Sequence, residues 1–195
     1  MKGPVKSDVG GAPLYQLKIT LKWSKPPIWR RLVAPSDMTL DRLHSVIQIA
    51  MGWTDSHMHQ FVVGRTFYGR SDPEMGGADI EMLDETRHSL ADLAPAAKSK
   101  FIYEYDFGDS WEHEVVVEKV LVPDRGFKHA ACLAGANNCP PEDCGGIGGY
   151  YDLLEAVSDP KHPDHADLKE WLDGDFDPAF FDLDETNARL RRVKA

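Results

Sequence analysis

The first part of the chain alternates between apolar and polar residues. Apolar Tyr15, Leu17, Ile19 and Leu21 alternate with polar Gln16, Lys18, Thr20 and Lys22. This period of two predicts a half-buried strand. The prolines of "SKPP" predict a turn, and "IWRRLVAP" predicts a second strand, so the two strands form a hairpin. "TLDRLHSVIQIAMGW" then changes to the helical period, with Thr39 placed to cap the helix and Gly52 to end it.

The middle of the chain continues with strands. "HMHQFVVG" and "RTFYG" predict two of them, and the polar residues 70–98 predict a loop with a short helix at "SLADLA". "FIYEYDFGDSWEHEVVVEKVLV" predicts a hairpin in which Phe107 shares a face with the three aromatic residues before it, and Trp111 is buried. Gly108 and Asp109 suit a two-residue turn, with Gly108 at positive φ.

The C-terminal part predicts mainly helices. A long loop runs to Gly149, and helices follow near residues 150–158, 164–173 and 185–192. Strands therefore come first and helices are concentrated in the C-terminal third, which predicts an α+β fold. We expect an antiparallel β-sheet built from hairpins, with helices packed on it. Residues 1–13 predict a flexible tail and residues 14–195 a single domain.

Composition and charge limit the classes of function. The 195 residues are 42% apolar and carry a net charge of −10. Residues 1–65 hold nine Lys/Arg and four Asp/Glu, and the remainder holds thirteen and twenty-eight, so the charges are +5 and −15. An acidic chain is a poor candidate for a general nucleic-acid binder. No apolar run approaches the ~20 residues of a bilayer span, and no secretory signal is present, so we expect a cytoplasmic protein without a membrane partner.

Histidines and acids supply candidate catalytic or metal-binding residues. His57 and His59 predict neighbours on one strand face, about 6–7 Å apart. Asp106, Asp109 and His113 lie close to the predicted turn, where carboxylates beside a histidine can bind a metal or transfer protons. The alternative is structural: Asp109 caps the turn through its side chain, Asp106 is solvated, and the histidines pack and form hydrogen bonds.

The cysteines suggest a zinc site. Cys132, Cys139 and Cys144, together with His129 or His113, offer the thiolates and imidazole that Zn²⁺ prefers. Their spacing is looser than that of paired zinc motifs, and three reduced cysteines in a turn-rich loop are the alternative. A phosphate site at "GGIGGY" is disfavoured because no Lys, Ser or Thr follows and two acids precede it. The stretch "CPPEDCGGIGGYYDLLEAV" then serves as a rigid turn that starts a helix.

The first hairpin suggests a nucleic-acid contact. Its basic residues Lys18, Lys22, Lys25, Arg30 and Arg31 are interleaved with Trp23 and Trp29. Such a pattern can bind the backbone and the bases of nucleic acid. The same charges also protect an edge hairpin from aggregation, or complement the acidic remainder of the chain.

Five segments in order resemble the plasmid pRiA4b ORF-3-like family, also described as insertion-element passenger proteins of the TnpR type. They are "YQLKITLKWSKPPIWRRL", "LHSVIQIAMGWTDSHMHQF", "YEYDFGDSWEHEVVVE", "CLAGANNCPPEDCGGIGGYYDLLEAVSDPKHPDH" and "FDLDETNARL", and they cover nearly all of Leu14 to Leu190. The resemblance implies an α+β fold and no known catalytic residue.

Two functions remain open from the sequence. The first is a non-catalytic binding or interaction module with a link to plasmid or mobile-element biology. The alternative is a metal-dependent hydrolase or nuclease that uses His57, His59, Asp106, Asp109 and His113. The density of ligand-type residues motivates the alternative, whereas the lack of a complete catalytic set favours the module.

Overall fold

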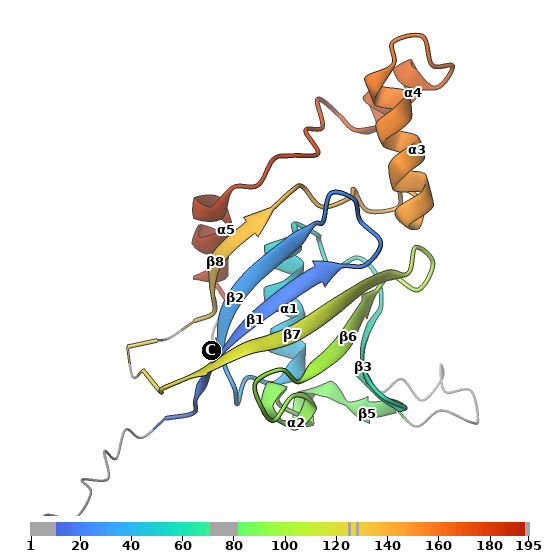
Figure 1. Cartoon of the computed structure of the whole chain (residues 1–195). Helices are drawn as coiled ribbons and strands as arrows, with labels where there is room; N and C mark the ends of the chain where they lie inside the picture. The colour runs from blue at the N-terminus through green and yellow to red at the C-terminus, as the bar shows by residue number, and fades with distance from the viewer. Residues whose placement is uncertain (1–10, 71–81, 125, 128, 194–195) are drawn as a thin grey trace, which may run out of the picture.

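The structure is a computed structural model that describes residues 11–70, 82–124, 126–127 and 129–193. One sheet contains eight strands in the order β5-β4-β3-β6-β7-β1-β2-β8 (Figure 1). The strands are β1 (Leu14–Leu21), β2 (Trp29–Pro35), β3 (His59–Val63), β4 (Thr66–Gly69), β5 (Met82–Asp84), β6 (Lys100–Tyr105), β7 (Trp111–Leu121) and β8 (Ala131–Ala136). All neighbours pair antiparallel except β4 and β5, which are parallel. The predicted α+β class and mainly antiparallel sheet are therefore confirmed.

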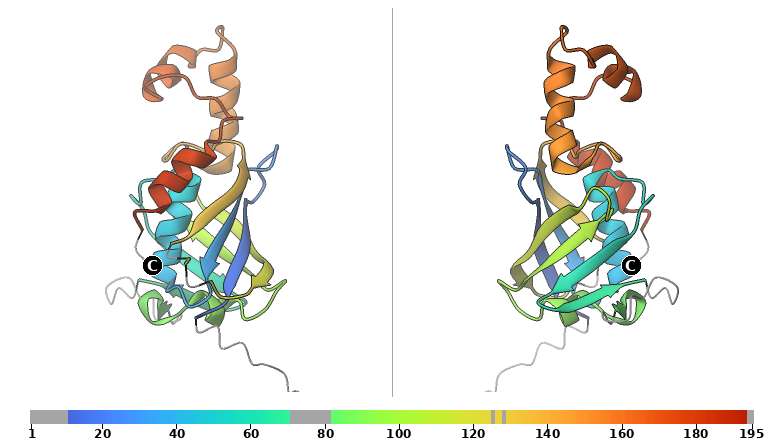
Figure 2. Two further views of the ribbon diagram at one scale, coloured as in Figure 1. Left: turned by 90° about the vertical axis from the view of Figure 1, so that its left-hand side faces the viewer. Right: turned by 90° about the vertical axis from the view of Figure 1, so that its right-hand side faces the viewer.

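The helices are spread along the chain. They are α1 (Leu40–Met51), the short 3-10 helix η1 (Glu85–Arg87), α2 (Leu90–Leu93), α3 (Gly146–Ser158), α4 (His165–Trp171) and α5 (Leu183–Leu190). The prediction that helices are concentrated in the C-terminal third is wrong, because α1 follows the second strand and α2 lies in the middle. Helices α1 and α5 lie on the same side of the curved sheet (Figure 2).

The core lies between the sheet and α1. Leu17 and Ile19 of β1, and Leu43 and Ile47 of α1, are fully buried. The alternation in β1 and the helical period in α1 therefore both identified the buried face. Gly52 ends α1 with φ of 101°, as predicted, because a left-handed C′ position favours a residue without a Cβ.

The turn between β6 and β7 differs from the prediction. Five residues connect Tyr105 to Trp111, and the positive φ angles belong to Asp106 (56°) and Ser110 (52°), not to Gly108. The Asp106 carboxylate accepts hydrogen bonds from the backbone N–H groups of Gly108 (2.9 Å) and Asp109 (3.3 Å), so this side chain organises the turn. Phe107 is 41% exposed rather than part of the buried aromatic row, whereas Trp111 is 1% exposed as predicted.

Two strands lie where loops were predicted. Strand β8 pairs with β2 within the region predicted as a long loop, and β5 pairs with β4. The small residues of β8, "ACLAGA", give no clear alternation. Helix α3 begins at Gly146, four residues before the predicted start. Residues 1–10 of the predicted tail lie outside the described residues, and the division into tail and domain stays a prediction.

Helices α3 and α4 project from one end of the sheet, beside the loop between β1 and β2 (Figures 1 and 2). After α4 the chain returns to the sheet and forms α5, which packs beside β8 (Figure 1). The Asn187 side chain accepts a hydrogen bond from the backbone N–H of Cys132 (2.8 Å) and donates one to its carbonyl (2.9 Å). Within the described ranges, no helix has the length and apolar character needed to cross a membrane.

Candidate functional site

Three segments that are far apart in the sequence meet at the end of the sheet from which α3 projects. They are the segment after α1 ("GWTDSH"), the β6–β7 turn and the loop 137–145 before α3. The Trp53 indole N–H donates to the carbonyl of Pro140 (3.0 Å). Glu142 accepts hydrogen bonds from the backbone N–H of Thr54 (3.2 Å) and from the Tyr105 hydroxyl. Burial and this bond to Glu142 raise the pKa of Tyr105 well above its usual value.

The glycines of "CGGIGG" allow a close approach of backbone at this junction. A Cβ on Gly146, whose φ is 68°, would lie 2.6 Å from the carbonyl oxygen of Asp109. A Cβ on Gly149 would lie 1.9 Å from the carbonyl oxygen of Cys144. The Asp109 carboxylate also accepts a hydrogen bond from the Gly145 N–H (3.2 Å). Gly145 and Gly146 therefore let the start of α3 lie against the β6–β7 turn, whereas Gly149 packs on Cys144, which precedes the helix. The rigidity of this helix start stays a prediction.

One histidine and two aspartates converge where these segments meet. His57 Nε2 lies 3.1 Å from Asp143 Oδ1 and 3.7 Å from Asp106 Oδ2. One ligand atom of each side chain lies within 4.8 Å of the other two, which is a spacing suited to a metal ion. Asp106 is buried, His57 is partly buried and Asp143 is exposed, so the cluster opens to solvent on the side of the 137–145 loop.

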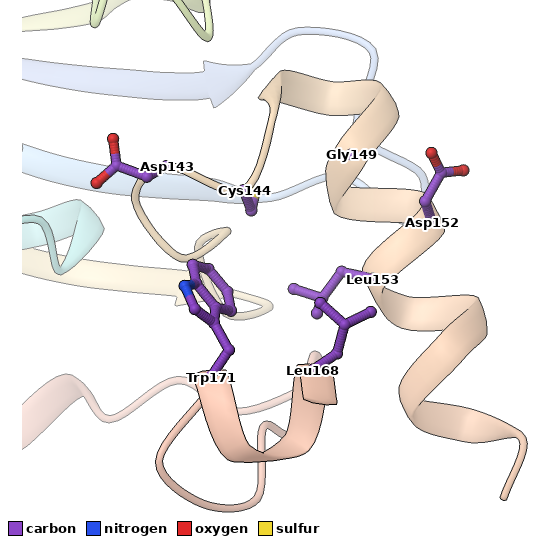
Figure 3. A pocket seen from close by; sticks show the side chains of 7 residues that line it. All are labelled: Asp143, Cys144, Gly149, Asp152, Leu153, Leu168 and Trp171. Carbon is purple, nitrogen blue, oxygen red and sulfur yellow. The ribbon is translucent and has the colours of Figure 1, made fainter. Parts of the chain in front are cut away.

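A cavity of about 360 Å³ lies beside Asp143, between α3 and α4. Leu153 of α3 faces Leu168 and Trp171 of α4 across it, and Asp143 and Asp152 lie near its edge (Figure 3). Trp171 is 48% exposed. Residues 139–185 hold fourteen Asp/Glu and two Lys, which is a formal charge of −12. The acidic character of the whole chain therefore resides in the segment that forms this cavity.

Comparisons with known proteins place the chain in a family. It matches the plasmid pRiA4b ORF-3-like protein family over residues 13–185. The chain belongs to this family. It is similar to the uncharacterized protein y4hQ of Sinorhizobium fredii (strain NBRC 101917 / NGR234), with 39% identity over 94% of each chain. It is also similar to a crystal structure of the protein of unknown function MM3350 from Methanosarcina mazei Go1. The TM-score is 0.79 and the identity 33%, over 89% of this chain and 96% of that one.

In this pRiA4b ORF-3-like protein His57 and His59 do not share a site, and the prediction that they are strand neighbours is wrong. Strand β3 begins at His59, which belongs to a buried network: its Nε2 lies 2.6 Å from Glu85 and its ring stacks on His44 at 3.4 Å. His44 in turn bonds Tyr103 (2.8 Å) and Asp55 (2.7 Å). Burial, together with the neighbouring His59, lowers the pKa of His44 to about 4.

The other members of the proposed hydrolase set are also separated. His113 is fully buried, with its ring edge-on to Trp53 at 5.3 Å. Asp109 contacts the start of α3, whereas Asp106 both caps the turn and faces His57. The structural alternative predicted that Asp109 caps the turn and that Asp106 is solvated. The structure shows instead that Asp106 is buried and caps the turn. Only His57 and Asp106 of the five predicted residues come together.

The cysteines do not gather around a common point. Cys132 and Cys139 are buried, Cys144 is partly buried, and all three thiols are free. Among the residues that the structure describes, no three ligand atoms from Cys132, Cys139, Cys144 and His129 lie within 4.8 Å of one another. Burial raises the pKa of both Cys139 and Cys144 to about 12. These thiols are protonated at neutral pH, and zinc binding through them stays a prediction that needs a rearrangement.

The basic residues of the first hairpin lie on both faces of the sheet. Arg30 is 2% exposed: its Nε donates to the carbonyl of Ala50 (2.7 Å) and its guanidinium stacks on Phe181 at 4.1 Å. Its inclusion among the predicted nucleic-acid contacts is wrong, because this side chain points into the core. Arg31 pairs with Glu118, and Lys22 with Glu112. Lys18 lies 5.3 Å from the Trp29 ring centre, and Lys25 is exposed in the loop.

Several site residues escaped the sequence analysis. His44, Glu85, Glu142 and Asp143 were not among the candidates. Glu142 and Asp143 had a usable signal, because two adjacent acids in a turn-rich loop next to glycines are a ligand-rich segment. The same two acids disfavour an anion at the glycines that follow them. His44 gave no such signal, because it lies on the buried and mainly apolar face of helix α1.

Proposed function

We propose that this family member is a non-catalytic interaction module that binds a cationic segment of a partner protein in the cavity between α3 and α4. The cavity with its acidic edge carries the proposal. Its volume is within the range of ligand pockets, and its lining residues combine apolar side chains with two aspartates at the edge. A Lys or Arg side chain matches such a site, because its aliphatic stem packs on apolar surface while its charged end meets an acid.

Trp171 strengthens the match. An exposed indole face attracts a guanidinium or ammonium group, which contributes about 0.5–1 kcal/mol at exposed sites. The charge of −12 in residues 139–185 adds a long-range attraction for basic partners and repels nucleic acid. The division of the five predicted catalytic residues among separate environments favours an interaction module over the hydrolase alternative. A link to plasmid or mobile-element biology rests on the family description and stays a prediction.

A binding titration tests the proposal. Isothermal titration of the full chain with a hexa-arginine peptide in EDTA should show binding, and a hexaglutamate peptide should show none. Trp171→Ala and Asp152→Asn should each weaken binding by about two- to fivefold, because the lost stacking and the lost exposed charge are each worth about 0.5–1 kcal/mol. Asp159→Asn at the end of α3 changes the charge by the same amount away from the cavity and should have little effect.

Two outcomes would contradict this assignment. Equal binding of both peptides would exclude recognition by charge. Equal weakening by Asp152→Asn and Asp159→Asn would show that the acidic surface attracts cations in general and that the cavity is not the site. Raised salt should weaken hexa-arginine binding, because Asp143 and Asp152 at the cavity edge are both exposed to solvent.

A further inference from the structure

The geometry points to a divalent transition-metal site formed by His57, Asp106 and Asp143. This metal site is separate from the cavity proposed to bind a cationic segment, although Asp143 borders both. The three side chains come from three segments: the stretch before β3, the β6–β7 turn and the loop before α3. A metal ion there would tie the loop 137–145 to the sheet and thereby fix one edge of the α3–α4 cavity.

The contacts around His57 differ from those of an ordinary hydrogen-bonded histidine. Its Nε2 is buried and has no hydrogen-bond partner within the described part of the chain. Asp143 Oδ1 is nevertheless only 3.1 Å away. At this distance a hydrogen bond fails only if the oxygen lies to the side of the direction in which the nitrogen donates. The Asp143 oxygen therefore lies to the side of the direction in which Nε2 would donate, and Asp106 Oδ2, at 3.7 Å, lies beyond hydrogen-bond distance.

This sideways arrangement is the one that metal ligands adopt. Bonds of about 2.1 Å to a shared ion place two ligand atoms about 3.0 Å apart at right angles and about 3.4 Å apart in a tetrahedron. The observed separations from Nε2, 3.1 and 3.7 Å, bracket the tetrahedral value. Asp106 Oδ1 accepts the backbone bonds of the turn, so Oδ2 is the oxygen directed at His57. A backbone-anchored carboxylate is a positioned ligand.

The second His/Asp cluster of the protein provides a contrast. In the group of His44, Asp55 and His59, each Nε2 bonds a carboxylate directly, at 2.7 Å for His44 and 2.6 Å for His59. Those nitrogens are fully used in hydrogen bonds, so that cluster serves as a buried structural network. Of the two clusters found among the described residues, the His57 group is the one that combines ligand spacing with a buried nitrogen that lacks a partner.

The ligand set indicates the kind of ion. Imidazole suits Zn²⁺, Fe²⁺ and related ions, and carboxylates suit harder ions, so one nitrogen and two oxygens favour a divalent first-row transition metal over Mg²⁺. Three protein ligands leave at least one coordination position for solvent or for a group of a partner. Asp143 is 69% exposed at its side chain, so the ion would be reached from the side of the loop 137–145.

Titration of the full-length protein with Zn²⁺, Mn²⁺ and Mg²⁺ tests the site. We expect one Zn²⁺ or Mn²⁺ per chain, much weaker binding of Mg²⁺, and a higher melting temperature with the bound ion. His57→Gln and Asp143→Asn should each lower the affinity by about tenfold or more. Asp152→Asn is the matched control: it removes the same charge at the cavity edge and should leave metal affinity unchanged.

The variants separate this inference from the proposed function. His57→Gln should weaken metal binding and leave hexa-arginine binding in EDTA intact, whereas Asp152→Asn should weaken hexa-arginine binding and leave metal binding intact. Unchanged affinity in both His57→Gln and Asp143→Asn would overturn the assignment, as would loss of metal binding in Cys139→Ser with the His57 variant unaffected. Absence of Zn²⁺ and Mn²⁺ binding would likewise overturn the assignment.

Discussion

Acid should destabilise this protein through its buried histidines, and His113 offers the clearest test. His113 lies on β7 with none of its surface exposed, and its Nε2 has no hydrogen-bond partner among the described residues. Burial, and to a smaller degree the nearby Arg30 guanidinium, lower the pKa of His113 from 6.5 to about 4. Tyr103, Trp53 and Trp111 complete its surroundings.

The sign follows from proton linkage. Because the folded pKa lies below the unfolded one, the unfolded chain binds more protons between pH 6.5 and 4. The contribution of His113 to the free energy of unfolding is therefore fully present above pH 6.5 and is lost as the pH falls toward 4. A pKa difference of about 2.5 corresponds to roughly 3 kcal/mol over the whole window, and to about 2 kcal/mol between pH 7 and 5.

Urea unfolding at pH 7 and pH 5 measures this contribution. His113→Leu removes the titrating group, so the loss of stability between the two pH values should be smaller by about 2 kcal/mol than in the unchanged protein. The comparison uses only the pH difference and is therefore insensitive to any packing cost of the substitution. The reasoning is refuted if His113→Leu loses as much stability on acidification as the unchanged chain.

Two further predictions concern buried and exposed partners in the same segments. Trp111→Ala should lower the unfolding free energy by about 3–5 kcal/mol. Asp109→Asn should lower it by about 1 kcal/mol or less, because this substitution weakens one exposed hydrogen bond. Similar losses for the two variants in urea unfolding would contradict the burial of Trp111. Arg30→Ala should destabilise the fold by roughly 3 kcal/mol or more, since charged donors to buried carbonyls are lost. Arg31→Ala should cost at most about 1 kcal/mol, and the reverse order in thermal unfolding would show that the two arginines are misplaced.

The regular parts of the fold were predictable because they depend on local periodicity. Strand β1 and helix α1 each expose one face and bury the other, so the spacing of apolar residues sufficed. The β6–β7 turn was mispredicted for a physical reason. Residue preference favoured Gly108 at positive φ, but the Asp106 carboxylate bonds two backbone N–H groups and stabilises a longer turn. Strand β8 was missed because its small residues carry almost no alternation.

The candidate site was less predictable because its contacts join distant segments. Thr54 and Glu142 are 88 residues apart in the chain, and Asp109 and Gly145 are 36 apart. No spacing rule within one segment predicts such pairs. Arg30 is different, since a signal existed: Arg30 and Arg31 are neighbours in a strand and must face opposite sides of the sheet. Because residues two apart in a strand share a face, Arg30 lies on the same side as the apolar Leu32, which is the buried side.

The spatial distribution of charge changes the partner that the sequence suggested. The basic excess of the first hairpin is offset by β7, where Glu112 and Glu118 pair with Lys22 and Arg31. On this face of the sheet the charges therefore largely cancel over a few ångströms, which leaves little field to attract an anionic backbone. Residues 139–185 combine a charge of −12 with a cavity. Because uncompensated charge determines long-range attraction, this distribution supports the proposed cationic partner over nucleic acid, at the same end of the sheet as the His57 cluster.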